Sequence, residues 1–248
     1  MIGQAFRYVF SNPKWGMSLL LASVCMLIPI IGPIVLLGFG TEVLRLLVTG
    51  QRGPCPEFTF DEFMKHLTKG LMPFLVQLVV SVVLMVISFG VTLPVVLVVI
   101  LVLANSSAKD YVPCCLFFTS FLVSVALSLI AWVFTTPILV RSMLTLDFKA
   151  SFDWAFIKDF ARRVWGPTIL KNLVVALVAV ALALVGEAAC CIGIYPAIVI
   201  INVVYWYMLA DLYEVYLQCG GMPIPLKEPP GSVQYGERGP AFEVEPKA

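Results

Sequence analysis

The feature that most limits what this chain can fold into is a run of 35 residues without a charge, from Gly70 to Ala104. About 20 apolar residues are enough to cross the hydrocarbon core of a bilayer as a helix, and a soluble domain has no place for so long an uncharged segment. The composition agrees, since 60% of the 248 residues are apolar and only 12% are charged, against roughly 45–50% and 25% in soluble domains. The sequence therefore predicts an integral membrane protein and excludes a secreted disulfide scaffold and a nucleic-acid binder.

Prolines, glycines and polar stretches divide the apolar sequence into about six spans. Inside a bilayer a segment that is not part of a closed barrel must be helical, because only a helix satisfies its own backbone hydrogen bonds. We therefore expect an all-α membrane protein, a polytopic helical bundle of about six transmembrane helices. The expected spans are two arms within Trp15–Gly50 split by Pro29-Ile30-Ile31-Gly32-Pro33, then Gly70–Ala104, Cys114–Leu144, Gly166–Gly186 and Ile194–Leu217.

Three shorter stretches have apolar residues at helical spacing and charges between them, which is typical of helices that lie in the membrane interface. The first is at the N-terminus and ends before Ser11-Asn12-Pro13, where we expect Asn12 to cap a new helix. The second has Thr59 and Glu62 in a capping-box pattern. The third runs from Phe148 to Val164. The apolar face of the second consists of Phe60, Phe63, Met64, Leu67 and Leu71.

The distribution of Lys and Arg decides whether Gly70–Ala104 crosses the membrane once or twice. With one crossing, fifteen of the sixteen basic residues share one side and only Lys109 lies opposite. With two crossings the division is seven against nine. The sequence therefore predicts one long crossing and places both termini in the cytoplasm. The apolar run at Trp15 has no cleavage site after it, so we read the start as mature protein rather than as a signal peptide.

The chain also repeats itself weakly. Phe10 and Trp15-Gly16 precede the first hairpin, and Phe160 and Trp165-Gly166 precede the last one with the same spacing. The second arm of each hairpin ends at a glycine, Gly50 or Gly220. Because both copies start from the same side of the membrane, the repeat is parallel, an arrangement known among transporters.

Two domains follow from composition: a polytopic helical membrane domain over 1–221 and a Pro/Gly-rich cytoplasmic tail over 222–248. The tail has too little apolar surface to fold alone, so we expect it to be disordered in isolation. It is a candidate segment for holding a partner protein.

Charged and polar groups inside the spans are candidate functional residues, because each charge costs about 2.5–3.5 kcal/mol at mid-bilayer. Glu42 and Arg45 are three apart, so they can pair on one helix face, either as an ion or proton site or as a structural pair. Asp211 and Glu214 lie near the end of the last span and can meet Arg162, Arg163 or Arg45. Asn202 can hydrogen-bond a neighbouring helix. The candidate intramembrane polar site is Glu42, Arg45, Asn202, Asp211 and Glu214.

A stripe of small residues on the fifth span permits another helix to approach closely. This candidate helix-packing face consists of Ala176, Ala179, Ala183 and Gly186. His66, the one histidine, lies between Lys65 and Lys69, and we expect it on a solvated face without a ligand role. The seven cysteines include the adjacent pairs at 114–115 and 190–191, and we expect them to be small packing residues.

The sequence has no phosphate-binding, zinc-protease, nucleophile-elbow or Cys/His metal pattern. It also lacks the cluster of acids and histidines that membrane lipid enzymes usually gather at the interface. We therefore expect no enzyme, no cofactor and no metal.

Several residues resemble a family of prokaryotic membrane proteins known as domain of unknown function 4013. They are Phe10-Ser11-Asn12-Pro13-Lys14-Trp15, Ile28-Pro29, Gly38-Phe39, Gly50, Phe58–Phe63 and Gly70, and the resemblance extends over roughly residues 1–220. Asn12 stands where the family leads us to expect an aspartate. The resemblance implies a polytopic helical protein of a prokaryotic inner (cytoplasmic) membrane, and it implies no catalytic residue.

Two functions remain open, with a third close to the first. The sequence favours a non-enzymatic accessory, scaffold or assembly subunit of a larger membrane complex, with membrane lipids and other membrane-protein subunits as partners. The alternative is a small transporter or channel for a lipid or other small solute, which requires a polar cavity at Glu42. A membrane-shaping or trafficking role cannot be distinguished from the first by sequence.

Overall fold

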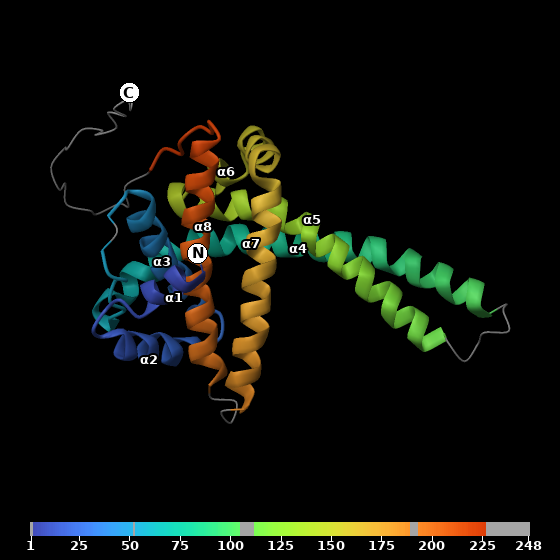
Figure 1. The fold of residues 1–248 in the computed structure, drawn as a ribbon, viewed down its shortest axis with the longest axis horizontal. Coiled ribbons are helices and arrows are strands. Elements are labelled where there is room, and N and C mark those ends of the chain that lie inside the picture. Colours follow the sequence, from blue (N-terminus) through green and yellow to red (C-terminus); the bar gives the residue numbers. More distant parts are fainter. Residues whose placement is uncertain (1, 52, 105–111, 189–192, 227–248) are drawn as a thin grey trace.

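The computed structural model describes residues 2–51, 53–104, 112–188 and 193–226, and these residues form helices joined by short connections (Figure 1). Lys109, the cysteine pair at 190–191 and the tail from 227 onward lie outside the described residues. In the described part there is no strand. The helices are α1 (Ile2–Val9), α2 (Trp15–Met26), α3 (Ile31–Val48), the 3₁₀ helix η1 (Phe60–Glu62), α4 (Phe63–Ala104), α5 (Val112–Thr145), α6 (Phe148–Ser151), α7 (Trp154–Ala188) and α8 (Ile194–Gln218).

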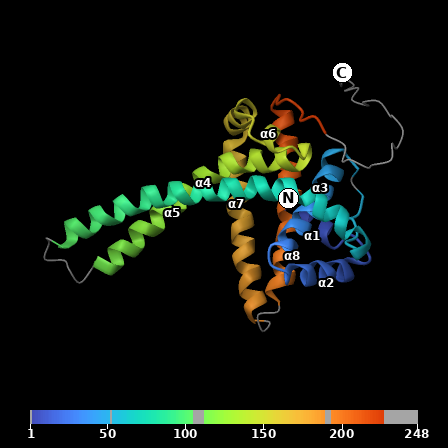
Figure 2. The same cartoon turned by 180° about the vertical axis from the view of Figure 1, so that it is seen from behind.

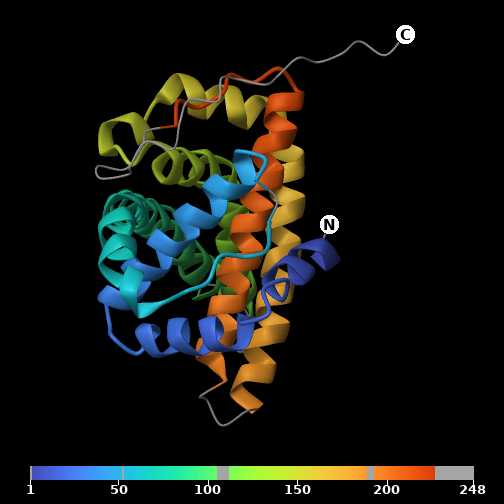
Figure 3. The same ribbon diagram turned by 90° about the vertical axis from the view of Figure 1, so that its left-hand side faces the viewer.

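Two long hairpins dominate the molecule. Helices α7 and α8 lie side by side, and the α4–α5 hairpin crosses them and projects to one side (Figures 1 and 2). Helices α1, α2 and α3 gather against α8 on the other side (Figure 3). The core lies where α3, α5 and α8 meet, and its fully buried residues include Val43, Leu44, Met143, Trp206 and Leu209.

The apolar surface faces outward, as expected for a protein in lipid. Within the described part of the chain, five helices are long and apolar enough to cross a membrane, against about six expected: α3, the helix from Phe60 to Leu101, α5, the helix from Phe148 to Ala188, and α8. In α4 and α5 no residue of the most apolar stretch is buried. Water-soluble monomers rarely expose apolar patches larger than a few hundred Å², so this surface belongs in a bilayer. The remaining apolar segment, α2, has only 12 residues, which is about 18 Å and too short to span alone.

The run Gly70–Ala104 is a single helix. Helix α4 passes through Gly90 and Pro94 without ending, although the sequence suggested an interruption there. Lipid offers no water to compete for the backbone groups that proline frees, so proline is tolerated inside membrane helices. One helix means one crossing, in agreement with the distribution of basic residues.

Glycines allow α3 to approach its neighbours closely. A Cβ on Gly70 would lie 2.7 Å from the Gly38 nitrogen, and a Cβ on Gly38 would lie 2.9 Å from the His66 Cα. A Cβ on Gly40 would lie 2.6 Å from the Trp206 ring. Because Cβ atoms essentially never come within 3.0 Å of such neighbours, side chains larger than hydrogen at these positions would push α4 and α8 away from α3.

Both second arms of the weak repeat end in the same motif. Gly50 and Gly220 have φ of 76° and 79°, which is left-handed backbone that suits glycine. The next residue's N–H returns to the helix in each case, from Gln51 to the Leu46 carbonyl at 3.1 Å and from Gly221 to the Tyr216 carbonyl at 3.0 Å. These are Schellman caps, in which a glycine after the helix lets the chain satisfy its last carbonyls.

The interfacial helices differ from expectation in their extents. Helix α1 forms as expected. In the second stretch, which begins at Phe60, Thr59 gives no side-chain cap to η1, and the chain continues directly into α4. The third stretch is divided, because Asp147 caps the short α6 and a new helix starts at Trp154. That helix, α7, then continues into its span with a kink at Val164, where φ is −129°.

Candidate functional site

A cavity of about 390 Å³ lies where the α4–α5 hairpin crosses α7 and α8. Small-molecule pockets typically hold about 300–1,000 Å³ and combine an apolar wall with a few polar groups. This cavity has both. Its polar residues come from all four helices: Gln77 and Ser81 on α4, Thr135 on α5, Asn172 on α7 and Tyr205 on α8.

The polar residues of the cavity differ in exposure. Gln77 and Ser81 are exposed on α4, where the neighbouring helix surface is apolar. Asn172 is buried and donates to the Thr168 carbonyl at 2.8 Å and to the Thr136 hydroxyl at 3.5 Å. The cavity therefore combines polar groups on the outer surface of α4 with one that is shielded from the surroundings.

A charged cluster lies at the crossing of α3 and α4. The ion pairs described for Glu42 are formed with Lys69 at 3.0 Å and Lys65 at 3.3 Å, both from α4. The sequence had suggested Arg45 as its partner. Arg45 is attracted by the charge of Glu42, but its guanidinium donates to the Leu144 carbonyl on α5 at 2.9 Å. Glu42 faces α4 because Gly38, one turn earlier, brings the two helices together.

His66 is the residue that sequence reasoning misplaced. It was expected on a solvated face, but its side chain is 1% exposed and lies flat against Phe58, with ring centroids 5.6 Å apart. Among the described residues neither ring nitrogen has a hydrogen-bond partner. Nδ1 lies 4.0 Å from a Glu42 oxygen and Nε2 lies 3.6 Å from a Glu62 oxygen. The signal that could have located it is glycine, since Gly38 and Gly70 permit the close crossing that buries the ring.

The other predicted polar residues have separate partners. Asp211 pairs with Lys171 on α7 at 2.6 Å, rather than with the arginines that we had considered. Asn202 donates to the Ile198 carbonyl of its own helix at 2.8 Å. Glu214 is exposed. The five candidate residues thus do not form one site in the described structure, and neither the cavity nor the smaller pocket described below is lined by Glu42.

Only part of the small-residue stripe on α7 packs against other helices of this chain. Gly186 is buried, and a Cβ there would lie 3.0 Å from Gly193 at the start of α8. Ala176 lines the cavity. Ala179 and Ala183 are half-buried on the same helix. Ala176, at the N-terminal end of the stripe, thus helps to form the cavity, and Gly186, at its C-terminal end, lets α7 and α8 come together.

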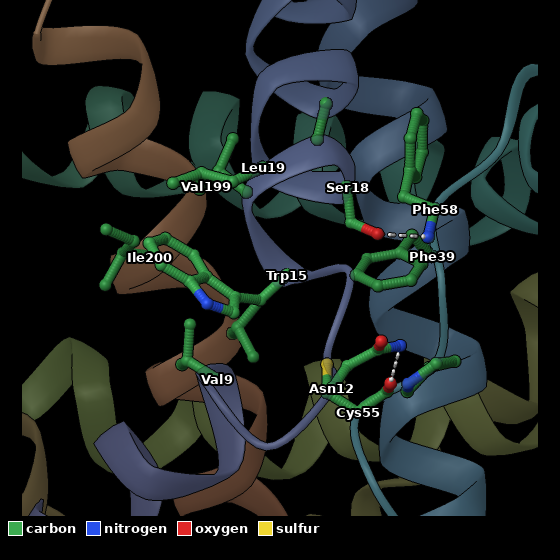
Figure 4. Close-up of a pocket in the computed structure, with 13 residues that line it drawn as sticks. Val9, Asn12, Trp15, Ser18, Leu19, Phe39, Cys55, Phe58, Val199 and Ile200 are labelled. Atoms are coloured by element: carbon green, nitrogen blue, oxygen red, sulfur yellow. Dashed lines mark hydrogen bonds between the residues drawn. The ribbon is translucent and has the colours of Figure 1, made fainter.

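The N-terminal segment is tied to the loop before α4 around a space of only about 30 Å³ (Figure 4). Asn12 donates to the Cys55 carbonyl at 2.9 Å, and the Phe58 N–H donates to the Ser18 hydroxyl at 3.1 Å. Asn12 also accepts from the Lys14 N–H at 2.8 Å, so it forms a turn before α2 rather than its cap. Burial raises the pKa of the Cys55 thiol to about 12. The space holds a water molecule at most, so this junction is structural.

The start of the expected tail belongs to the packed structure. The Ile224 side chain is 5% exposed, and its N–H donates to the Tyr213 hydroxyl at 2.7 Å. The Met222 N–H donates to the Tyr216 hydroxyl at 3.2 Å. Packing therefore continues past the boundary at 221 that composition suggested, because the two tyrosines on α8 give the emerging backbone its partners.

Comparison with known proteins gives a family and no function. No curated protein and no solved structure matches the chain. The model of a family described as "Protein of unknown function (DUF4013)" matches residues 21–192, which excludes Phe10–Trp15 and all of α8 from the matched region. The match covers more than half of the chain, and the chain belongs to this family of unknown function.

Proposed function

We propose that this protein is a non-enzymatic integral membrane protein that binds a lipid-like amphiphile in the cavity between the α4–α5 and α7–α8 hairpins. The observation that carries the proposal is the convergence of Gln77, Ser81, Thr135, Asn172 and Tyr205 on one mostly apolar space of about 390 Å³. Polar groups at bilayer depth are expensive, so they usually pair with one another or contact a ligand.

The form of the cavity indicates which class of ligand suits it. Its apolar wall includes Trp132 and Ile138, which would contact a hydrocarbon chain, while the buried Asn172 offers a polar contact. A molecule with an apolar body and a small uncharged polar group satisfies both surfaces. A charged solute does not, because none of the described residues that line the cavity is Lys, Arg, Asp or Glu. The ligand class is therefore a neutral or weakly polar lipid, rather than an ion.

Photo-crosslinking in nanodiscs tests the proposal. A diazirine-bearing diacylglycerol is incorporated into the bilayer, and labelled peptides are identified by mass spectrometry. We expect labelling concentrated on the cavity residues of α4, α5 and α7. Labelling spread evenly over all lipid-facing helices would show ordinary boundary lipid and would refute the proposal.

Two matched variants sharpen this test. Ser81→Phe places a bulky ring beside the cavity, and Ala126→Phe places the same ring at an exposed position on α5 outside it. Cavity labelling should fall several-fold in the first variant and persist in the second. Equal labelling in both would mean that the probe does not occupy the cavity.

An accessory-subunit role is the second candidate, and the α4–α5 hairpin favours it. Most helices of a polytopic bundle pack against several neighbours, whereas the most apolar stretches of α4 and α5 have no buried residue. An exposed row of Phe117, Phe121, Ser124 and Ser128 runs along α5 at helical spacing, and small residues permit close helix contact in membranes. Other membrane-protein subunits, held through this hairpin or through the tail, are the partners of this proposal.

Purification in gentle detergent tests the second candidate. The chain is isolated with and without residues 222–248, and a third preparation carries Phe121→Ala and Ser124→Leu. Stoichiometric co-purifying membrane proteins, lost in either variant, would support a subunit role. A lone monomer or homo-oligomer in all three preparations would reject it. The family resemblance leads us to propose a prokaryotic cytoplasmic membrane, and the distribution of basic residues favours a cytoplasmic C-terminus. A cytoplasmic N-terminus as well, which the sequence predicted, would need an even number of crossings and therefore a crossing by α2, which has only 12 residues.

A further inference from the structure

We propose that Glu42, Glu62 and His66 form a binding site for a divalent first-row transition-metal ion at the crossing of α3 and α4. One ligand atom from each of the three residues lies within 4.8 Å of the others. The site is separate from the amphiphile cavity and does not depend on the proposed function.

His66 carries the argument, because a buried imidazole without partners is expensive. Burying a polar group without a hydrogen bond costs about 1–3 kcal/mol, yet in the described structure both ring nitrogens lack a partner while the ring is 1% exposed. The two nearest carboxylate oxygens lie 3.6 Å and 4.0 Å from the ring nitrogens. A metal ion bound by both carboxylates and one ring nitrogen would give that nitrogen a partner, and the other nitrogen would keep its proton and face the second carboxylate.

The position between the two carboxylates already attracts a cation. The Lys65 ammonium lies 2.8 Å from a Glu62 oxygen and 3.3 Å from a Glu42 oxygen. Its side chain is 42% exposed, so it can move into solvent at little cost when another cation arrives. Lys69 is 13% exposed and stays 3.0 Å from the Glu42 Oε2, the oxygen that also faces His66. Glu42 would therefore bind the metal through a second lone pair of Oε2 or through the Oε1 that Lys65 leaves.

The donor set selects the class of metal. Imidazole with carboxylates suits Zn²⁺ and neighbouring first-row ions, whereas Mg²⁺ and Ca²⁺ prefer oxygen ligands alone. Three protein ligands leave at least one coordination position, and the half-exposed Glu62 places that position toward water. Two lysines close by reduce the affinity, since they neutralise both carboxylates. Removal of Lys65 should therefore tighten binding.

The single histidine gives a direct measurement. In untagged protein labelled with ¹⁵N-histidine, His66 supplies the only imidazole signals. Titration with Zn²⁺ should shift the signal of the ligating nitrogen and fix one tautomer. A signal that does not change up to millimolar Zn²⁺ overturns the proposal. This readout also excludes Zn²⁺ bound by the exposed thiols Cys114 and Cys219, because such binding would leave the imidazole unchanged.

Three variants should change the affinity for Zn²⁺ in different ways. Glu62→Gln keeps the shape of the side chain and should weaken Zn²⁺ binding roughly tenfold or more. Lys65→Met removes the competing ammonium and should tighten it several-fold. Glu57→Gln alters a carboxylate that pairs with Lys14 outside the cluster and should change nothing. If Glu62→Gln and Glu57→Gln bind Zn²⁺ equally, or if Lys65→Met weakens binding, the ion is not held by this cluster and the proposal is wrong.

Discussion

Replacing Gly70 by alanine should destabilise the protein, while the same replacement at Gly90 of the same helix should not. A Cβ on Gly70 would overlap the Ile34 carbonyl oxygen and lie 2.7 Å from the Gly38 nitrogen. Non-bonded carbon atoms are comfortable at about 3.5–4.0 Å, so α3 and α4 must separate by more than about 1 Å. Around Gly90 there is no atom within 4 Å to oppose a new methyl group.

The expected magnitude follows from two terms. Alanine is more favourable than glycine inside a helix by about 1 kcal/mol, and both variants receive this gain. Overpacking typically costs about 1–3 kcal/mol, and only Gly70→Ala pays it. The two variants should therefore differ in free energy of unfolding by about 1–3 kcal/mol, which corresponds to roughly 2–12 °C in melting midpoint for a chain of this size. The cost can be higher, because the atoms in the way belong to the backbone.

Buried thiols provide the assay. Cys25 and Cys55 are buried and free, so a thiol-reactive dye reports their exposure on heating once the remaining five cysteines are replaced by serine. The Gly70→Ala protein should react at a lower temperature than the Gly90→Ala protein in the same detergent. Equal midpoints would refute the close crossing of α3 and α4, and with it the burial of His66 on which the metal proposal depends.

Three further changes test other parts of the structure. Asn12→Asp keeps the acceptor but removes the donor to the Cys55 carbonyl, so thermal melting should show a loss of about 1–3 kcal/mol; an unchanged midpoint would contradict that hydrogen bond. Ile30 is 68% exposed with φ of 71°, so Ile30→Gly should stabilise the α2–α3 turn by about 1 kcal/mol, and a lower midpoint would contradict the strain. Burial raises the pKa of the Cys55 thiol to about 12, so this thiol stays protonated and should resist an impermeant maleimide at about pH 8. Exposed Cys219 should react with the same reagent in inside-out vesicles only. Reaction of Cys219 in right-side-out vesicles would contradict a cytoplasmic C-terminus.

The sequence predicted the parts of the fold that depend on local pattern. The length of the uncharged run predicted the membrane-spanning part of α4, and Gly50 and Gly220 predicted where α3 and α8 end. Local pattern also misled where tertiary contact decides. Phe60 and Met64, expected on the apolar face of an interfacial helix, are exposed, but His66, expected on the solvated face, is buried.

The candidate sites could not be predicted for the same reason. The cavity exists only because two hairpins cross, and no spacing within α4 or α7 shows where that crossing falls. Likewise, Glu42 and Glu62 are twenty residues apart, and they converge on His66 because Gly38 and Gly70 allow two backbones to touch. Glu42 and Asp211 could be selected from the sequence because a charge inside the bilayer is costly. Their ion-pair partners, Lys69 for Glu42 and Lys171 for Asp211, could be identified only from the structure.

The uncharged length of α4 limits how the helix can lie in a bilayer. From Leu71 to Ala104 the helix is uncharged for about 34 residues, or roughly 51 Å at 1.5 Å per residue. This length exceeds a hydrocarbon core of about 30 Å, so the helix must tilt, bend or locally thicken the bilayer to stay within it. The span of α7 from Gly166 to Ala188 is about 34 Å long and exceeds the core much less.

The two hairpins do not run side by side, since α4–α5 runs across α7–α8 (Figures 1 and 2). The polar groups of the cavity lie at that crossing, so the arrangement of the hairpins that differs most from a parallel bundle is also the one that forms the proposed amphiphile site.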